Sequence, residues 1–249
     1  MKVAVILPAA GLGTRMKAAA EATGISRKQF MQIEGVPVLI HTVRKFVACP
    51  LVNEVVIALR ADDLEWVDAL VRAEAPPKPV RCVAGGESRQ HSVENALASL
   101  APDVEIVVVH DAVRPFVAPE TIIQVIEAAA KAGAAIVGIV PVDTVKQVQR
   151  NVVRGTLNRD RLVLAQTPQV FRAEVLRQAF EKAREDGFFG TDESSLVERL
   201  ENREVVVVPG TDRNIKITRP SDIELARLFL HEEQNKAQSK SAAETIEPA

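Results

Sequence analysis

Basic side chains surround a loop of small residues near the start of the chain. The loop Pro8–Gly13 contains two alanines and two glycines, and it follows the unbroken apolar run Val3–Leu7. Arg15 and Lys28 come after the loop, at either end of a polar insert. Small residues let the backbone approach a ligand closely, and successive N–H groups in such a loop can bind an anion. The pattern therefore predicts a phosphate site, with two cations able to reach one polyphosphate.

The glycine spacing is that of neither common nucleotide-binding loop. The sequence Gly-Leu-Gly-Thr-Arg-Met at residues 11–16 lacks the third glycine of the dinucleotide fingerprint, and no acidic residue closes a second strand about 20 residues later. The Gly-Lys-Ser/Thr sequence of the P-loop is also missing. Taken alone, the two glycines fit a tight turn between a strand and a helix equally well, and Lys28 fits a solvated surface lysine.

An acidic and a basic residue follow a later apolar run. Asp111 comes just after the run Glu105–Val109, and Arg114 lies three residues further on. Ligands of open α/β sheets bind at the carboxyl ends of the strands. A carboxylate there suits Mg²⁺ or a ribose hydroxyl, although capping of the following turn is the structural alternative. We interpret His110 as packing support rather than as a catalyst.

Further polar side chains are spread along the rest of the chain. Ser92 follows the Gly85-Gly86 turn, and its hydroxyl can either read the edge of a base or simply begin a helix. Later residues form a second set of candidate anion-binding groups, separate in sequence from the first. This set comprises Thr144, Lys146, Arg159, Thr167, Thr191 and Lys216.

The elements that must position these residues alternate along the chain. Stretches with helical periodicity separate short apolar runs, which are typical of strands buried on both faces. These runs are Val3–Leu7, Glu54–Leu59, Val80–Val83, Glu105–Val109 and Ala135–Pro141. Such alternation predicts βαβ units, and hence an α/β, Rossmann-like fold with a mostly parallel twisted sheet.

The alternation stops between residues 143 and 162. Asp143–Gln149 and Val152–Leu157 are short and alternate polar with apolar residues, which predicts a protruding two-stranded β-arm. A lone hairpin is marginally stable in water, so we expect this arm to pack on a partner subunit and form a homodimer. We predict one domain over residues 1–230. Residues 231–249 lack apolar periodicity and are predicted to be disordered.

Composition excludes several classes of protein. The 31 basic and 33 acidic residues give a net charge of −2, whereas nucleic-acid binding usually requires a strongly basic surface. No apolar run approaches the roughly 18 residues of a membrane span, and the N-terminus lacks the pattern of a signal peptide. Two cysteines, Cys49 and Cys82, suggest no disulfide framework. We therefore expect a cytoplasmic protein without nucleic-acid or membrane partners.

Eight ordered motifs connect these features to a known family. They are PAAGLGTRM, KQF, HDAVRPF, VDT, LNRDRL, QTPQVF, TDESS and NIKITRP, and they are spread over residues 3–230. With them the chain resembles the 2-C-methyl-D-erythritol 4-phosphate cytidylyltransferases of the non-mevalonate isoprenoid pathway. The resemblance implies a fold of the nucleotide-diphospho-sugar transferase type. It also implies transfer of CMP from CTP to 2-C-methyl-D-erythritol 4-phosphate, with Mg²⁺ or another divalent cation and release of pyrophosphate.

The resemblance also implies roles for individual residues. The catalytic residues would be Arg15, Lys28, Arg159 and Lys216, with Arg159 reaching the site from the neighbouring subunit's arm. The nucleotide would contact Ala9, Ala10, Gly11, Gly13, Gly86, Ser92 and Asp111, and Asp111 would also lie near the metal. The methylerythritol phosphate would be bound by Arg114, Thr144, Thr167 and Thr191.

The chain departs from the family pattern at a few positions. Arg27 stands before Lys28 where the family commonly has proline, and the insert Lys17–Arg27 is longer than usual. Arg27 is a further cation that can compete with Lys28 for the phosphates. Val113 replaces the common alanine, as in ribitol-5-phosphate cytidylyltransferases, which are the alternative function. A non-catalytic nucleotide-binding module is the alternative from another class, because the fold alone does not establish catalysis.

Overall fold

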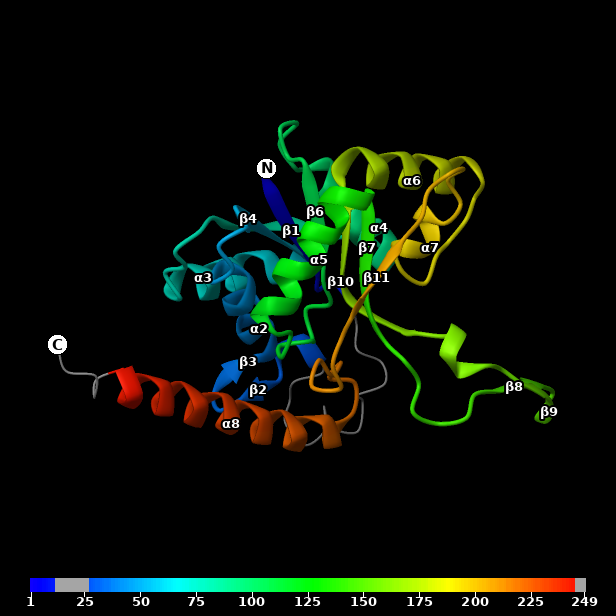
Figure 1. Cartoon of the computed structure of the whole chain (residues 1–249). Coiled ribbons are helices and arrows are strands. Elements are labelled where there is room, and N and C mark those ends of the chain that lie inside the picture. The colour runs from blue at the N-terminus through cyan, green and yellow to red at the C-terminus, as the bar shows by residue number, and fades with distance from the viewer. Residues whose placement is uncertain (12–26, 245–249) are drawn as a thin grey trace.

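The fold is built around a seven-stranded sheet in the strand order β11-β7-β10-β6-β1-β4-β5 (Figure 1). A computed structural model describes residues 1–11 and 27–244 of the chain. Within the described sheet, β10 runs antiparallel to its neighbours β6 and β7, and the other pairings are parallel. The predicted α/β fold with a mostly parallel sheet is therefore confirmed.

Strands β1, β4, β5, β6 and β7 agree with the five predicted apolar runs to within two residues at each end. The sheet consists of β1 (Val3–Pro8), β4 (Glu54–Leu59), β5 (Val80–Ala84), β6 (Ile106–Val109), β7 (Ala134–Ile139), β10 (Leu164–Arg172) and β11 (Val206–Pro209). The α-helices are α2 (Val38–Val47), α3 (Leu64–Ala73), α4 (Arg89–Ala98), α5 (Pro119–Ala132), α6 (Ala173–Glu185), α7 (Ser194–Val197) and α8 (Pro220–Glu244). Shorter elements are the 3₁₀ turns η2 (Lys28–Phe30), η3 (Ala61–Asp63) and η4 (Arg159–Arg161), and the small ladder of β2 (Gln32–Ile33) and β3 (Val36–Pro37).

Helices cover both faces of the sheet, which explains the unbroken apolar runs. In β1, Val3, Val5 and Leu7 belong to the core beneath α2 and α5. Ala4 and Ile6 alternate with them and belong to the core beneath α4 and α6. All of these side chains are fully buried. A strand with two buried faces has no position for a polar residue until it reaches its carboxyl end.

A third apolar cluster joins segments that are far apart in the sequence. Met31, Val113 and Ile217 are buried together against the first part of α8. The Ile217 N–H also donates to the Val113 carbonyl oxygen at 2.9 Å. Each lies within three residues of a predicted site residue, namely Lys28, Asp111 and Lys216. This cluster therefore holds three site-bearing segments in one place.

The predicted two-stranded arm is present. Strands β8 (Lys146–Gln149) and β9 (Val152–Thr156) form an antiparallel ladder separate from the main sheet, and the arm extends away from the body (Figure 1). Several valines on and beside it are exposed, among them Val142, at 85% of its surface, and Val153, at 58%. The arm thus presents apolar side chains that its own chain does not cover.

The prediction of a disordered tail is wrong for residues 231–244, which continue helix α8. No glycine or proline interrupts this stretch, and its glutamate, glutamine, lysine and alanine residues favour a helix even without an apolar stripe. Glu233 lies 2.7 Å from the Lys45 ammonium and holds the helix to α2. The predicted domain boundary at residue 230 therefore falls inside a helix. Residues 245–249 lie outside the described residues.

The great length of α8 does not make it a membrane segment. Its residues are largely polar, with charged side chains such as Glu232 and Glu233 on its surface. Among all helices in the part of the chain that the structure describes, none is both long enough and apolar enough to cross a membrane.

Candidate active site

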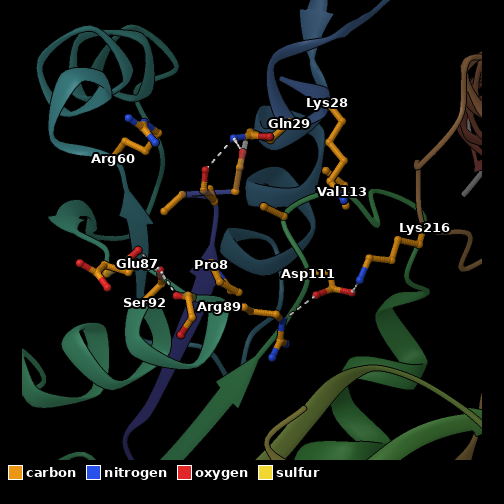
Figure 2. A pocket seen from close by; sticks show the side chains of 16 residues that line it. Pro8, Lys28, Gln29, Arg60, Glu87, Arg89, Ser92, Asp111, Val113 and Lys216 are labelled. Carbon is orange, nitrogen blue, oxygen red and sulfur yellow. Dashed lines mark hydrogen bonds and ion pairs between the residues drawn. The ribbon is translucent and has the colours of Figure 1, made fainter. Parts of the chain in front are cut away.

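A cavity of about 380 Å³ opens where the carboxyl ends of β1, β4, β5 and β6 meet. Figure 2 shows side chains from these separate segments converging on it. The predicted site residues that line it are Ala9, Ala10, Gly11, Lys28, Gly86, Ser92, Asp111 and Lys216. The structure therefore brings together residues as far apart in the sequence as Ala9 and Lys216, at the edge of the sheet where α/β folds bind ligands.

The remaining predicted residues lie behind or beyond this cavity. Thr167 and Arg114 contact Asp111 from behind, while Thr144, Arg159 and Thr191 are exposed residues outside the lining. Thr144 and Arg159 lie on the segments that lead into and out of the arm, and Thr191 lies on the loop before α7. Gly13 and Arg15 lie outside the described residues.

Asp111 is the centre of charge in the cavity. The Lys216 ammonium lies 2.8 Å from Asp111 Oδ2, and Arg114 Nε lies 3.4 Å from the same oxygen. Arg89 Nε lies 3.4 Å from Oδ1. Figure 2 marks the ion pairs of Asp111 with Arg89 and with Lys216. Burial by itself would raise the pKa of Asp111, but Arg89 and Lys216 hold it well below its usual range. Lys216 and Thr167 of the second predicted set therefore contact Asp111, beside the cavity that Lys28 of the first set also lines.

Arg89 and Glu193 are site residues that the sequence reasoning missed. Arg89 Nη1 donates to both carboxylate oxygens of Glu193, at 2.7 and 2.9 Å, and Glu193 is almost completely buried. Burial raises the pKa of Glu193, although Arg89 partly opposes this effect. Arg89 thus connects Asp111 with the loop that carries Thr191. The TDESS motif contains Glu193 and was a signal for it, whereas no motif marked Arg89.

Gln29 is a further residue that was missed as a site residue, although it stands inside the KQF motif. Its side chain is buried, and Nε2 donates to the carbonyl oxygens of Ala9 at 2.7 Å and Gly11 at 3.2 Å. These bonds attach η2 to the loop that follows β1. Because Lys28 is the neighbouring residue, Gln29 sets the distance between Lys28 and the small-residue loop.

The turn after β5 leaves no room for larger residues. A Cβ atom added at Gly86 would lie 2.5 Å from the Cβ of His91, and one at Gly85 would lie 2.8 Å from the Cβ of Ala10. The Ser92 hydroxyl accepts from the Gly86 N–H at 3.1 Å and donates to the Ser88 carbonyl oxygen at 2.8 Å. Ser92 therefore supports this turn, and its contact with a base remains a prediction.

His110 is a buried residue next to the site. Its Nε2 lies 3.0 Å from the Arg114 carbonyl oxygen, and its ring packs edge-on against Phe46. Burial lowers the pKa of His110 to about 4. The imidazole is therefore neutral at pH 7 and donates from Nε2, which agrees with the interpretation of His110 as packing support.

The pKa of His110 makes stability depend on pH. In the unfolded chain His110 binds a proton below its ordinary pKa of 6.5, whereas in the folded chain it stays neutral down to about pH 4. The free energy of unfolding therefore decreases as the pH falls from about 6.5 towards 4. We expect this residue to account for a loss of about 2 kcal/mol between pH 7 and 4.5. Urea unfolding of the wild type and of His110→Gln at both pH values measures it. The variant should lose less stability, the exposed His231→Gln control should behave like the wild type, and equal losses in all three proteins would contradict the prediction.

Comparison with known proteins decides the family. The sequence profile of the 2-C-methyl-D-erythritol 4-phosphate cytidylyltransferase family matches residues 3–232. The chain belongs to this family. A cytidylyltransferase of this name from Solibacter usitatus is 65% identical, over 94% of this chain and 97% of the relative. Another from Acidobacterium capsulatum is 52% identical, over 95% of this chain and 100% of the relative.

Solved structures of this cytidylyltransferase family have the same fold. The enzyme from Thermus thermophilus superimposes with a TM-score of 0.73 at 31% identity, covering 92% of this chain and 98% of that one. The 4-diphosphocytidyl-2C-methyl-D-erythritol synthase from Anaerococcus prevotii superimposes with a TM-score of 0.80, also at 31% identity and with the same coverage. The predicted family, fold and enzyme class are thereby confirmed.

Proposed function

We infer that this chain transfers the cytidylyl group of CTP to 2-C-methyl-D-erythritol 4-phosphate, a step of the non-mevalonate isoprenoid pathway. The products are pyrophosphate and 4-CDP-2-C-methyl-D-erythritol. Membership of the cytidylyltransferase family over residues 3–232 carries this inference. The cavity supports it, because a small-residue loop, Lys28, Arg89 and Lys216 face one space of a size that suits a nucleotide.

The reaction needs charge neutralisation rather than a general base. An oxygen of the methylerythritol phosphate attacks the α-phosphorus of CTP, the bond to the β-phosphate breaks, and pyrophosphate carries away the electron pair. Because the attacking phosphate is already ionised near pH 7, no proton has to be removed from it. Rate acceleration then comes from positioning and from cations that face the growing negative charge. We assign this role to Lys28 and Lys216 in the cavity, together with Arg15.

The binding roles proposed for single residues rest on the family resemblance and on the residues that line the cavity. The nucleotide is proposed to lie on Ala9, Ala10, Gly11 and Gly13 and against the turn at Gly86 and Ser92. The sugar phosphate is proposed to lie on the other side of Asp111, near Arg114, Thr167, Thr144 and Thr191. Support comes from Arg114 and Thr167, which contact Asp111, and from the Arg89–Glu193 pair, which brings the Thr191 loop towards the cavity.

Asp111 is also the proposed ligand of a divalent cation. The described residues contain no cluster of three or more His, Cys, Asp or Glu side chains that could hold a metal by themselves. Mg²⁺ is commonly bound by one or two carboxylates, with substrate phosphates and water completing its shell, and Asp111 fits this arrangement. Bound there with CTP, the ion would neutralise charge on the phosphates.

Replacing Asp111 by asparagine tests the metal proposal. We expect Asp111→Asn to reduce the gain in CTP affinity that Mg²⁺ produces by about tenfold, or about 1.4 kcal/mol, because the amide keeps the shape but loses the charge. Binding of metal-free CTP should stay the same or become tighter, since Arg89, Arg114 and Lys216 lose their anionic partner. Calorimetric titration with and without Mg²⁺ measures both. An unchanged effect of Mg²⁺ would remove Asp111 from the metal site.

The arm is proposed to complete the site in a homodimer. Its exposed valines, with Val142 at 85% and Val148 at 55%, are apolar surface of the kind that subunit interfaces bury. Arg159 at the base of the arm donates to the Val142 carbonyl oxygen at 2.5 Å and lies outside the cavity of its own chain. We propose that it serves the partner's cavity. A cytoplasmic location is proposed as well, which two unpaired cysteines support.

Release of pyrophosphate tests the function directly. The purified protein should release pyrophosphate when CTP, Mg²⁺ and 2-C-methyl-D-erythritol 4-phosphate are all present, and not when the sugar phosphate is left out. Faster release with ribitol 5-phosphate would favour the alternative enzyme. CTP binding without any release of pyrophosphate would favour a non-catalytic nucleotide-binding module.

A further inference from the structure

A compact cluster of charged and aromatic side chains lies beside Lys28. The Arg27 guanidinium forms an ion pair with Asp63 Oδ2, and it also lies over the Phe30 ring, 5.0 Å from the ring centroid. The Trp66 indole N–H donates to Asp63 Oδ1 at 3.1 Å. Phe30 and Trp66 pack edge to face with their centroids 4.5 Å apart. These four residues, Arg27, Phe30, Asp63 and Trp66, form what we call the Arg27 cluster.

The Arg27 cluster connects two segments that both reach the cavity. Arg27 and Phe30 flank Lys28 in and beside η2, and the Phe30 N–H donates to the Arg27 carbonyl oxygen at 3.1 Å. Asp63 ends η3, which follows Arg60, another residue of the cavity lining. The cluster therefore attaches the backbone of Lys28 to the segment that follows β4.

Gln29 holds the same short turn from the opposite side. Its two hydrogen bonds to Ala9 and Gly11 attach η2 to the loop after β1. With Gln29 on one side and the Arg27 cluster on the other, the backbone of Lys28 is held between two elements of the cavity wall. Lys28 and Gln29 line the cavity, whereas Arg27 is not among the described residues that line it (Figure 2).

We propose that Arg27 and Asp63 are positioning residues for CTP turnover: their partly buried ion pair, packed on Phe30 and Trp66, sets the position from which Lys28 meets the phosphates. Arg27 accordingly does not compete with Lys28 for the phosphates. Asp63 is 1% exposed, so its charge depends on Arg27 for compensation. Without these contacts, Lys28 on its short turn would lose the defined position that it needs to stabilise the negative charge of the phosphates. The proposal rests on the proposed role of Lys28.

Asp63→Asn separates positioning from folding. The amide can still accept the hydrogen bond from Trp66, and the Arg27 guanidinium, whose side chain is 24% exposed, can be solvated by water, so the melting temperature should stay close to that of the wild type. We expect kcat/KM for CTP to fall on the order of tenfold, with KM for the methylerythritol phosphate unchanged. Arg27→Gln should cause a similar loss of kcat/KM, and the double variant should lose no more than either single one.

A more exposed ion pair elsewhere provides the control. Arg44 of α2 and Glu74, the residue after α3, lie 2.7 Å apart and do not line the cavity, so Glu74→Gln removes an arginine–carboxylate pair away from it. This variant should keep wild-type kinetics. Wild-type kcat/KM in Asp63→Asn would overturn the proposal, and so would tighter CTP binding, because it would mean that the released Arg27 binds phosphate directly. A wild-type protein without any CTP turnover would instead contradict the proposed function.

The cluster also carries its own spectroscopic probe. Trp66 is the only tryptophan of the chain, and the chain has no tyrosine, so intrinsic emission above 300 nm reports on this cluster. If Lys28 and the cluster are mechanically connected, CTP should change the Trp66 emission of the wild type, and Asp63→Asn should show a smaller change. An emission that does not respond to saturating CTP in the wild type would overturn the connection.

Discussion

Replacing Lys28 by alanine is expected to lower kcat by about 10²–10³-fold and to leave the fold intact, which is the size of effect seen when one preorganised donor to transition-state charge is removed. Lys28 faces the cavity from η2, beside the small-residue loop after β1. Negative charge grows on the leaving pyrophosphate, and water in the place of an ammonium would have to reorganise to solvate it. Steady-state kinetics with both substrates saturating measures the loss.

A surface lysine provides the comparison for Lys28. Lys182 pairs with Asp186 at 2.9 Å on the exposed side of α6, so Lys182→Ala removes the same charge far from the cavity. Its kcat should match that of the wild type. If Lys28→Ala has a near-normal kcat and an unchanged melting temperature, Lys28 does not stabilise the transition state. Lys28→Arg should recover part of the rate, because the charge is kept while its geometry changes.

Lys216→Ala is expected to lower kcat/KM for the methylerythritol phosphate by about 10²-fold, with CTP affinity changed no more than a few fold. CTP affinity should change little because three cations contact the Asp111 carboxylate. Lys216 is 2.8 Å from that carboxylate, yet Arg89 and Arg114 also contact it and remain when Lys216 is removed. Asp111 therefore stays paired with Arg89 and Arg114, and the part of the cavity proposed to bind CTP should change little. Calorimetry with CTP and kinetics at varied sugar phosphate measure the two effects separately, and a collapse of CTP affinity would place Lys216 on the nucleotide side.

Arg159→Ala extends this test to the dimer. We expect Arg159→Ala to weaken binding of the methylerythritol phosphate, although Arg159 lies outside the cavity of its own chain. If the arm serves the partner's cavity, a mixture of the Lys216→Ala and Arg159→Ala proteins should be more active than either variant alone, since a mixed dimer contains one complete site. Absence of any regained activity after subunit exchange would show that Arg159 acts elsewhere.

Much of the fold could be predicted because burial on both faces of a parallel sheet leaves a clear pattern. The strands appear as short apolar runs, and the arm appears as an alternating pair interrupted at Asn151. Local patterns also located part of the cavity lining, such as Ala9, Gly86 and Asp111, since residues that follow parallel strands must meet at one edge of the sheet. The tail was mispredicted because the absence of an apolar stripe was taken to mean disorder. Intrinsic helix propensity and ion pairs to the body were enough to form a helix.

The sequence by itself determined the strands, the arm and the motifs that identify the family, because each depends on residue types at short spacing. Tertiary structure alone decided which charges meet. Strand β6 lies between β1 and β10, and this order brings Arg89, Arg114 and Lys216 to one carboxylate at Asp111. It also decided that Arg27 pairs with Asp63 rather than facing the cavity. Such contacts join segments far apart along the chain, and only their packing brings the side chains within a few ångströms.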